Sequence, residues 1–381
     1  MEQYSVRKTY KYKVMPTPQQ EQALETVLSR CRTLYNCALE QRTTWWGRGQ
    51  GVGASYYQQA TELPDLKVAC PEYGEVHSQV LQDELRRVDT TYQAFFRRVA
   101  NGETPGYPRF QGVNRYHSFT YPQYGNGAVL DGRMLSLSKI GRISIRLHRP
   151  QAGTPKTVTL SKEADGWYAC ISCAEMPVEP LPHTGEETGI DVGLKVFLIT
   201  ADGGVVENPR HYRKAEQQLA KAQRRVSRRK QGSKRRRKAV HLLRLKHQQV
   251  HRQRTDFHHK TALDLLRTYD TIYLEDLQVA NMVQNHHLAK SISDASWYAF
   301  RTILEGKAAY AGRRVVAVPP AYTSQDCSGC GKRIHKTLSV RTHTCTNCGL
   351  MMDRDENAAV NIRRAGQARQ ALTWPAGASV A

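Results

Sequence analysis

The chain opens with alternating apolar and polar residues from Val6 to Val14, a pattern that predicts a half-buried β-strand. In the Met-Pro-Thr-Pro run that follows, Thr17 predicts a helix N-cap, because Pro18 suits the first helical position and Gln20 completes a capping box. Apolar residues then recur at helical spacing and predict a core-facing stripe. The stripe consists of Ala23, Leu24, Val27, Leu28, Cys31, Leu34, Tyr35, Ala38 and Leu39.

A second helix is expected between residues 76 and 100, after a glycine-rich interruption at residues 47–53. One of its faces is apolar, which predicts a second core-facing stripe. The members of this stripe are Leu81, Leu85, Val88, Tyr92, Phe95, Phe96 and Val99. The first hundred residues are therefore predicted to form a mostly helical module.

From Gly106 onward, short alternating runs broken by Gly, Pro and Asp replace the helical spacing. They occupy residues 116–122, 134–138, 142–149, 156–163 and 166–176. This pattern is typical of an antiparallel sheet or a small barrel. Cys170 and Cys173 would face opposite sides of one strand, so we interpret them as packing residues and not as metal ligands. The N-terminal strand can join this sheet, which would make the helical module an insertion.

A third region follows a linker rich in Pro, Gly and Glu at residues 181–187. We expect short strands within 188–209, a long basic helical stretch over about 212–268, a buried strand ending in acids at 271–277, a helix at 292–312 and a strand at 313–320. The region closes with paired cysteines, a helix that begins near Asp353 and a loose tail rich in Pro, Gly and Ala.

At 381 residues the chain is long enough for two or three domains. Its 56 lysines and arginines exceed its 34 aspartates and glutamates, and the resulting formal charge of +22 favours nucleic acid as a partner. A membrane partner is disfavoured, because no apolar run approaches the ~20 residues that span a bilayer and the first residues lack the apolar core of a signal peptide. Nine cysteines in an unexported chain indicate reduced thiols, some of them on metal. We therefore expect a soluble, cytoplasmic nucleic-acid-binding protein.

Two Cys-x-x-Cys pairs, Cys327/Cys330 and Cys345/Cys348, stand fourteen residues apart. Each pair can form a tight knuckle, and four thiolates complete the tetrahedral shell of one zinc ion with no position left for water. A glycine after each pair allows the chain to turn back under its own sulfurs. We therefore expect a structural zinc site, in preference to buried cysteines at coincidental spacing.

Three acids occupy positions at which a mixed α/β sheet would gather them. They are Asp191 in an early strand, Glu275 at the carboxyl end of a later strand, and either Asp353 or Asp355 at the start of the last helix. Carboxylates suit Mg²⁺, and two such ions about 4 Å apart can clamp the attacking and leaving oxygens of a phosphodiester. With Asp353 as the N-cap of a capping box, Asp355 is the metal ligand that we favour. Asp276 points to the opposite face of the strand from Glu275, so we expect only a secondary role for it.

Half of the residues from 213 to 238 are lysine or arginine, and a single acid lies among them. Such a density of like charge disfavours a helix without an anion beside it, so we expect a phosphate backbone there and not merely a solvated face or a disordered tail. Rows of guanidinium groups along a groove would bind without reading sequence. The candidate contacts are Arg224, Arg225, Arg228, Arg229, Lys230, Arg235 and Arg236.

Several motifs in combination resemble the TnpB family. They are GIDVGLK, YLEDL, SISDASW, the YTSQDCSGCG and CTNCG segments around the cysteines, and DRDENAAVNI, together with MPTPQQEQAL, YNCAL and GYPRFQ in the N-terminal half. TnpB proteins are transposon-encoded RNA-guided DNA nucleases, akin to the ancestors of type V CRISPR effectors. The resemblance covers nearly the whole chain, and the three nuclease acids of the family fall on Asp191, Glu275 and Asp355.

The resemblance implies a multidomain α+β fold. An N-terminal wedge β-barrel would carry an inserted helical recognition module, and a ribonuclease-H-like (RuvC) α/β domain would carry an inserted zinc ribbon. The expected parts are a wedge strand at 1–14, the helical module at 15–105, the wedge barrel at 106–182, the first part of the RuvC-like nuclease at 183–321, the zinc ribbon at 322–352, the last part of the nuclease at 353–368 and a flexible tail at 369–381.

The resemblance also implies a guide RNA from the transposon end and a double-stranded DNA target beside a short motif, cut in a single RuvC site. The implied cofactors are two catalytic Mg²⁺ ions and one structural Zn²⁺. We expect one protein chain per RNA, no membrane, and the cytoplasm of a bacterium or archaeon, in association with the nucleoid. Base pairing would read the target and the protein would read the flanking motif, for which Tyr56 and Gln82 are our candidates.

Two alternatives stay open. One is a catalytically silent RNA-guided repressor or transposition accessory protein, which would be expected to lack one or more of the three acids. The other is a transposase that joins strands itself, which we rank last because no Tyr or His pair forms a recognisable strand-transfer motif.

Overall fold

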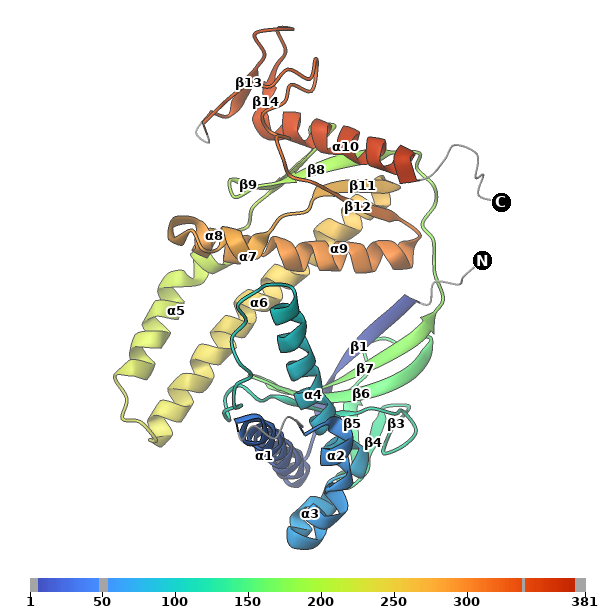
Figure 1. Cartoon of the computed structure of the whole chain (residues 1–381), viewed down its shortest axis with the longest axis vertical. Coiled ribbons are helices and arrows are strands. Elements are labelled where there is room, and N and C mark those ends of the chain that lie inside the picture. The colour runs from blue at the N-terminus through green and yellow to red at the C-terminus, as the bar shows by residue number, and fades with distance from the viewer. Residues whose placement is uncertain (1–5, 48–53, 338–339, 374–381) are drawn as a thin grey trace. The chain divides into compact units, whose positions relative to one another are not determined.

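The computed structural model describes residues 6–47, 54–337 and 340–373 of the 381-residue chain. The chain divides into two compact units, Met1–Pro177 and Val178–Ala381, which we call the N-terminal unit and the C-terminal unit. Both units contain helices and strands (Figure 1), so the expected multidomain α+β class is confirmed. Every helix within the described residues is too short or too polar to traverse a lipid bilayer.

A seven-stranded antiparallel sheet belongs to the N-terminal unit. In spatial order its strands are β2 (Ser118–Tyr121), β6 (Thr154–Glu163), β7 (Gly166–Met176), β1 (Val6–Met15), β5 (Gly141–Arg146), β4 (Met134–Leu137) and β3 (Ala128–Asp131). The first strand pairs with β7 and β5, which confirms that the helices after it are inserted in the sheet. Cys170 and Cys173 both lie on β7, and Cys173 is buried in the core.

The inserted helices form the rest of this unit. They are α1 (Pro18–Gly47), α2 (Tyr56–Thr61), α3 (Leu63–Ala69), the 3-10 helix η1 (Pro71–Glu75) and α4 (Ser78–Ala100). The predicted capping box starts α1, because the Gln20 N–H donates to Thr17 Oγ1 (3.3 Å) and the Thr17 N–H donates to Gln20 Oε1 (3.0 Å). Most of the α1 stripe and the first part of the α4 stripe are buried, as expected from their spacing, while Ala23 and Leu28 are partly buried.

The last part of the α4 stripe is a correction to the sequence-based prediction. Phe96 and Val99 are exposed, although the helical spacing places them on the apolar face. Tyr92 is the last buried residue of the stripe, and its hydroxyl lies 3.2 Å from that of Thr43, close to the end of α1. The final turns of α4 therefore extend past the helix against which the rest of the stripe packs.

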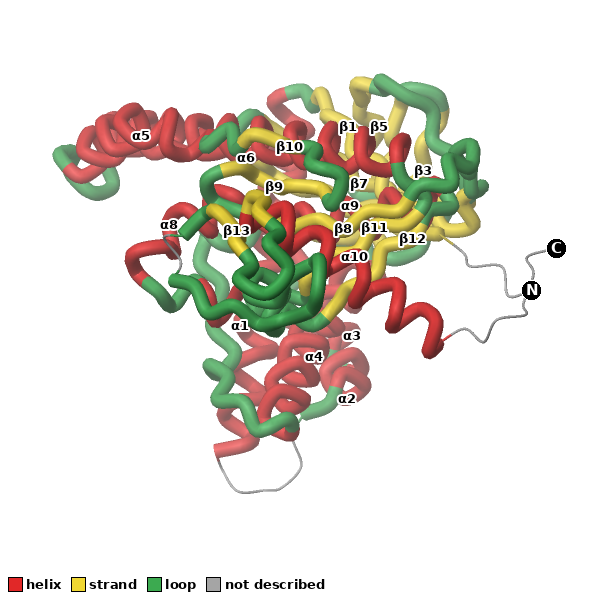
Figure 2. The backbone as a smooth tube through the Cα atoms, turned by 90° about the horizontal axis from the view of Figure 1, so that it is seen from above, coloured by secondary structure: helices red, strands yellow, loops and turns green. Residues whose placement is uncertain are grey.

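The C-terminal unit is built on a five-stranded mixed sheet with helices on both faces (Figures 1 and 2). In spatial order its strands are β10 (Val205–Glu207), β9 (Val196–Thr200), β8 (Glu187–Val192), β11 (Thr271–Glu275) and β12 (Arg314–Val318). Strands β8, β11 and β12 are parallel, whereas β9 and β10 run antiparallel to their neighbours. The other elements are α5 (His211–Ser227), α6 (Lys234–Thr268), α7 (Val279–Met282), α8 (His286–Ala295), α9 (Trp297–Ala311), β13 (Thr342–Thr344), β14 (Met351–Asp353) and α10 (Arg354–Thr373).

Two helical stretches expected from the sequence are broken in the structure. The basic stretch forms two helices, α5 and α6, joined by a turn in which Gly232 has a φ of 80° and the Ser233 side chain caps α6. The helix expected over residues 292–312 is divided between α8 and α9 at Ser296, whose φ is 55°. In both places a residue with a left-handed backbone conformation redirects the chain.

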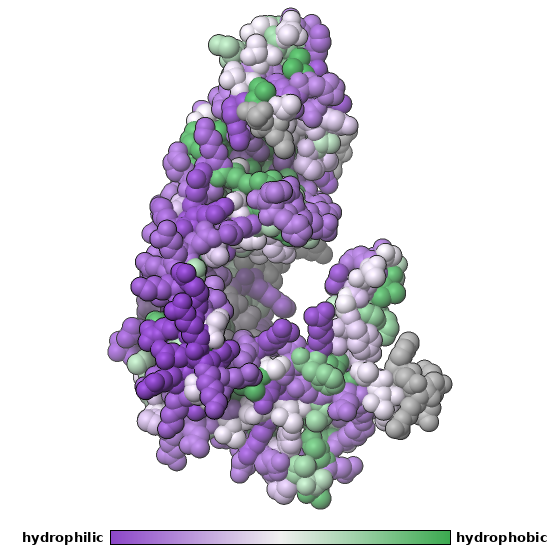
Figure 3. Space-filling model, turned by 90° about the vertical axis from the view of Figure 1, so that its left-hand side faces the viewer, coloured by the Kyte–Doolittle hydropathy of each residue, from purple (hydrophilic) through white to green (hydrophobic). Residues whose placement is uncertain are grey.

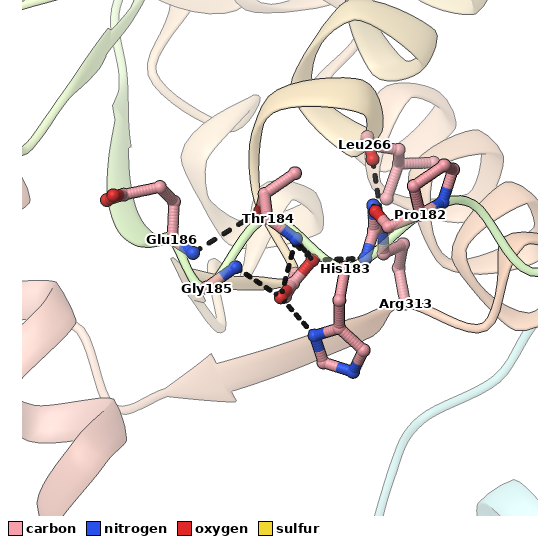
Figure 4. Close-up of polar contacts among 8 residues, drawn as sticks. Pro182, His183, Thr184, Gly185, Glu186, Leu266 and Arg313 are labelled. Atoms are coloured by element: carbon pink, nitrogen blue, oxygen red, sulfur yellow. Dashed lines mark hydrogen bonds and ion pairs between the residues drawn. The ribbon is translucent and has the colours of Figure 1, made fainter.

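At the amino-terminal end of β11, Asp270 fixes the segment that leads into β8. Figure 4 shows the residues around it: Pro182, His183, Thr184, Gly185, Glu186, Leu266 and Arg313. The carboxylate accepts hydrogen bonds from the N–H groups of Thr184 (3.1 Å) and Gly185 (2.8 Å) and forms an ion pair with buried Arg313. Although desolvation opposes ionisation, these two amides hold the pKa of Asp270 below its ordinary value. Asp270 and its partners therefore lie at the opposite end of β11 from Glu275.

A buried carboxyl in the N-terminal unit makes the stability of this unit depend on pH. Glu84 on α4 is fully buried, and its burial raises its pKa to about 7 although Arg87 lies 3.4 Å away. Tyr116 donates a hydrogen bond to the same carboxyl group. Because the folded protein holds this proton at a pH where the unfolded chain releases it, the contribution of Glu84 to stability is lost as the pH rises from 5 toward 8.

We therefore predict that Glu84→Gln becomes progressively more favourable relative to wild type as the pH rises from 5 to 8. A shift from the ordinary value of 4.5 to about 7 corresponds to a change on the order of 2 kcal/mol in the difference between the two unfolding free energies. Denaturant unfolding at several pH values measures this difference. Glu103→Gln, which removes an exposed partner of Arg98, is the control. The difference between its unfolding free energy and that of the wild-type protein should be the same at every pH. An equally flat difference for Glu84→Gln would contradict the prediction.

Candidate functional site

The structure brings Asp191 and Glu275 side by side at the carboxyl ends of two parallel strands. Ile190 of β8 and Leu274 of β11 are register partners, so the residues that follow them, Asp191 and Glu275, are neighbours across the ladder. Adjacent strands lie about 4.8 Å apart, and residues in register project from the same face of a sheet. The two carboxylates therefore leave the sheet at one place and in one direction.

The burial of the neighbouring residues shows which face carries them. Ile190 and Leu274 belong to the core that the sheet forms with α6 and α9. Side chains alternate between faces along a strand, so Asp191 and Glu275 point to the opposite face, on which α10 packs (Figure 1). Tyr273 confirms this assignment, because it joins Ile362 of α10 in a separate core.

Helix α10 lies unusually close to this face because two glycines leave room for it. A methyl group at Gly189 of β8 would overlap the carbonyl oxygen of Ala359, and one at Gly366 would overlap the ring of Tyr273. The Tyr273 hydroxyl in turn donates to Gln370 Oε1 (2.6 Å) near the end of the helix. The contact therefore holds the whole length of α10 over β8 and β11.

Asp355 enters the site from the first turn of α10. Asp353 is the N-cap, as predicted, because its Oδ1 accepts hydrogen bonds from the N–H groups of Asp355 (2.8 Å) and Glu356 (3.4 Å). The carboxylate of Asp355 is half-buried, and Arg341 Nη1 lies 3.4 Å from its Oδ2. Asp353 is exposed and its Oδ1 caps the helix, whereas Asp355 is the less exposed of the two acids.

The three carboxylates form a cluster of like charge. Burial raises the pKa of Asp191 well above its ordinary value, and the charges of Glu275 and Asp355 raise it further. Burial also raises the pKa of Glu275, although the Thr323 hydroxyl donates to its Oε1 (2.5 Å). For Asp355, burial again raises the pKa and the charge of Arg341 opposes the rise.

The oxygens of these three acids are of the kind that a divalent cation takes as ligands. Three partly buried carboxylates repel one another, and oxygen ligands of this kind are what Mg²⁺ prefers. In the residues that the structure describes, these carboxylates do not form a group as compact as the four thiols described below. Asp276, by contrast, forms an ion pair with Arg301.

The four predicted zinc cysteines come together in a closed cluster. Their Sγ atoms all lie within 4.8 Å of one another, and the Cys327–Cys348 and Cys330–Cys345 pairs are each 3.6 Å apart. The glycines that follow the two pairs, Gly331 and Gly349, have φ values of 76° and 72°, as the expected turns require. Among the described residues the group consists of these four thiols, a ligand set that suits a structural zinc.

Two asparagines of α10 attach the cysteine-rich segment to the acid cluster, and sequence reasoning missed them. Asn357 Nδ2 donates to the carbonyl of Asp326 (2.8 Å), and its Oδ1 accepts from the N–H of Ser328 (2.9 Å). Asn361, one turn later, donates to the carbonyls of Thr323 (2.8 Å) and Asp326 (2.7 Å). Their spacing of four residues in DENAAVNI is a signal for one helix face. Thr323, which donates to Glu275, is therefore held from two sides.

The predicted phosphate-contacting residues lie on α5, on α6 and in the turn between them, and so they do not form a continuous row along one helix. Arg224 and Arg225 end α5, Arg228 and Arg229 belong to the turn with Lys230, and Arg235 begins α6. Arg236 differs from them, because its Nη1 donates to the carbonyls of Val226 (3.0 Å) and Arg229 (3.1 Å) and so closes the end of α5. The face of the molecule seen from the side of α5 is strongly hydrophilic (Figure 3).

The two candidate motif-reading residues lie on neighbouring helices of the N-terminal unit. Tyr56 starts α2 and Gln82 lies on α4, and both are half-buried. The guanidinium of Arg86, one turn after Gln82, stands 5.2 Å from the centre of the Tyr56 ring. Arg86 is a further surface cation at this position that the sequence did not single out.

Comparisons with known proteins were made on the whole chain. The family model OrfB_IS605, described as "Probable transposase", matches residues 170–286, and "Cas12f1-like, TNB domain" matches residues 297–362. A model described as "Helix-turn-helix domain" matches residues 1–51, whose described part consists of β1 and α1.

Full-length relatives were also found. A "Putative RNA-guided DNA endonuclease" of Streptomyces pristinaespiralis is 36% identical, over 96% of this chain and 91% of the relative. The "Putative RNA-guided DNA endonuclease InsQ" of Escherichia coli strain K12 is 30% identical, over 94% of this chain and 92% of the relative. The solved structure of a Cas12f1–sgRNA–target DNA complex shares the fold, with a TM-score of 0.55 and 12% identity over 94% of this chain and 99% of that one.

The close contact of α10 can be tested with two glycines that both lie inside helices. Gly366→Ala places a methyl group against the Tyr273 ring and should lower the free energy of unfolding by about 1–3 kcal/mol. Gly306→Ala on α9 meets no atom within 4 Å and should raise it by about 0.5–1 kcal/mol, because alanine favours the helix. Thermal or denaturant unfolding of both variants measures the contrast. Equal effects of the two substitutions would show that α10 does not lie as close as described.

Metal analysis tests the cysteine cluster. The wild-type protein should hold one zinc ion per chain, and Cys345→Ser should lose it together with thermal stability, because zinc binding is part of the folding free energy of such a segment. Cys37→Ser, which alters an exposed cysteine of α1, is the matched control and should retain the metal. A metal-free wild-type protein with unchanged stability would refute the assignment.

Proposed function

Because this chain belongs to the TnpB (OrfB of IS605) family, we propose that it is an RNA-guided DNA endonuclease that hydrolyses phosphodiester bonds at Asp191, Glu275 and Asp355. The relatives' descriptions support the guided-endonuclease activity. The single observation that carries the catalytic assignment is geometric: register places Asp191 and Glu275 side by side at the carboxyl ends of β8 and β11, and α10, whose first turn carries Asp355, packs on the same two strands.

Each of the three acids would have a distinct support. Asp191 and Glu275 are fixed by the parallel strand ladder, and Asp355 is fixed by the capped start of α10. Thr323 orients Glu275 through its hydroxyl group. When bound among these oxygens, Mg²⁺ supplies a Lewis acid for the phosphate and a water of lowered pKa. The hydrolysis would form one P–O bond from water and break one backbone P–O bond, with one water proton passing to the leaving oxygen, so that one end keeps the phosphate and the other a hydroxyl group.

The remaining features support the larger complex. We propose that the two units correspond to a wedge-type sheet with its helical module and to a RuvC-like nuclease with a zinc ribbon. Guide RNA from the transposon end would pair with one strand of a double-stranded DNA target, and the protein would contribute the cationic surface of the α5–α6 pair. Tyr56, Arg86 and Gln82 are our candidates for reading a short motif beside the target.

The test uses the protein together with the RNA that co-purifies with it. Sequencing this RNA identifies the guide, and a duplex that carries the matching sequence should be cut only when Mg²⁺ is present. Asp191→Asn should lower the cutting rate by about 1,000-fold or more, since the metal supplies several kcal/mol of transition-state stabilisation. Binding of the matched duplex should persist.

Asp256→Asn, an exposed acid of α6 in the same unit, is the control and should cut at the wild-type rate. Target binding without any Mg²⁺-dependent product from the wild-type protein would favour the catalytically silent repressor. Cutting by Asp191→Asn at the wild-type rate would overturn the catalytic assignment while leaving the guided activity intact.

A further inference from the structure

Helix α5 begins beside α8 in the C-terminal unit (Figure 1). Residues of both helices line a cavity of about 590 Å³ there. The residues that matter in its lining are Lys195, Asn208, Arg210, Arg213, Asp294 and Arg341. They come from the turn after β8, the segment between β10 and α5, the first turn of α5, helix α8 and the residue before β13. Its volume is in the range of about 300–1,000 Å³ that is usual for ligand sites.

The cations of this cavity are held in place by the backbone. Asn208 Nδ2 donates to the carbonyl of Leu194 (3.0 Å), and Asn208 Oδ1 accepts from the N–H of Arg210 (3.1 Å). Arg210 itself has a φ of 48°, and its Nη2 donates to the carbonyl of Lys195 (3.3 Å). The turn after β8 and the start of α5 are thereby joined, which keeps Lys195 and Arg210 on the same wall.

The charge of this wall is not neutralised from inside the cavity. Asp294 is the one acid in the lining, and it is buried and already bonded to the N–H groups of Tyr212 (2.9 Å) and Arg213 (3.3 Å) at the start of α5. In the part of the chain that the structure describes, neither Lys195 nor Arg210 has a carboxylate within ion-pair distance. Two exposed cations on a pre-formed wall are suited to an anion from solution.

The same wall adjoins the acid cluster. Arg341 lines the cavity and at the same time lies 3.4 Å from the carboxylate of Asp355. Lys195 also stands near enough to Asp355 for its charge to act on that carboxylate. An anion in the cavity would therefore lie beside Asp355, against a lining that holds four cations and one acid, the already bonded Asp294.

We propose that this cavity is a phosphate-binding subsite for the DNA strand being cut, with Lys195 and Arg210 as positioning residues. The proposal rests on the proposed function. A DNA strand carries a phosphate at every nucleotide, so a strand with one phosphodiester at the carboxylates presents another to the adjoining cavity. Arg210 and Lys195 would hold that second phosphate and fix the strand, while the acids act on the first. Such contacts position a strand without reading its sequence.

The test compares two double variants under single-turnover conditions with a saturating matched duplex. Lys195→Gln/Arg210→Gln removes the unpaired cations of the cavity and should slow cutting by about 10- to 100-fold, the usual loss for hydrogen bonds to a charged group. Lys260→Gln/Arg267→Gln removes two exposed cations of α6 and should cut like wild type. Overall duplex affinity should change by less than about threefold in both, because most phosphate contacts lie elsewhere.

A second arm leaves the protein unchanged and so does not depend on how the variants fold. Single phosphates near the cut are replaced, one at a time, by neutral methylphosphonates in the strand that is cut. One position other than the scissile bond should slow the wild-type protein by about 10-fold or more and should have little further effect on Lys195→Gln/Arg210→Gln, because both changes remove the same contact. Asp191→Asn stays inactive on every one of these substrates.

The outcomes separate the two proposals. Failure of the wild-type protein to cut an unmodified matched duplex would defeat the proposed function and this subsite with it. If the wild-type protein cuts but the cavity variant cuts equally fast, the subsite is refuted and the nuclease assignment stands. The subsite is likewise refuted if every methylphosphonate slows the cavity variant as much as it slows the wild-type protein.

Discussion

The C-terminal unit depends on the close packing of α10 on its sheet, which leaves no room for a side chain at Gly189 or Gly366. At Gly189 the backbone of α10 approaches the backbone of β8, and at Gly366 the helix approaches the ring of Tyr273. Because atoms in direct contact cannot approach further, close packing of this kind fixes the distance between α10 and β8. Asp355 lies one turn before Ala359, the residue in contact with Gly189, so this contact sets where Asp355 meets the carboxyl ends of β8 and β11. Asn357 and Asn361 of the same helix carry the cysteine-rich segment along with it.

Gathering Asp191, Glu275 and Asp355 at one place destabilises the fold of the C-terminal unit. Three carboxylates share a partly buried region, and burial and mutual repulsion raise the pKa of Asp191. Opposing contributions come from the Thr323 hydroxyl at Glu275 and from the charges of Arg341, Arg354 and Lys195 at Asp355. The charge of Arg354 also opposes the rise in the pKa of Asp191. Functional sites commonly retain such unfavourable arrangements because the ligand relieves them. A divalent cation would turn this repulsion into shared coordination.

Much of this arrangement could be predicted from sequence, because it follows from local pattern and spacing. Strand periodicity placed Asp191 in an early strand and Glu275 at the carboxyl end of a later one, and the DRDE sequence identified Asp353 as the cap. The cysteine spacing predicted that four thiols gather at one point, and the described thiols do. The contacts that hold these parts together were not predictable in the same way. Gly189 and Gly366 become informative only once β8 and α10 are known to touch, and they are 177 residues apart in the sequence (366 minus 189).

Other errors arose where apolar spacing continued past a structural boundary. Phe96 and Val99 keep the spacing of the α4 stripe although α4 has passed the end of its partner, and Ser296 interrupts a run that looks continuous. The Gly232-Ser233 pair, a break and cap signal, was available in the sequence and would have separated α5 from α6. The periodicity of apolar residues therefore predicts which face of a helix is apolar, but it does not predict where the element packed against that face ends.

The most direct test of the account is to locate the divalent ions themselves. Crystals of the protein with its guide RNA, grown in Mn²⁺ in place of Mg²⁺, allow the ions to be located by their anomalous scattering. The account predicts one or two ions at about 2.1 Å from carboxylate oxygens of Asp191, Glu275 and Asp355, with at least one of these acids shared between ions if two are present. Manganese bound elsewhere on the chain, with none among these three carboxylates, would contradict it.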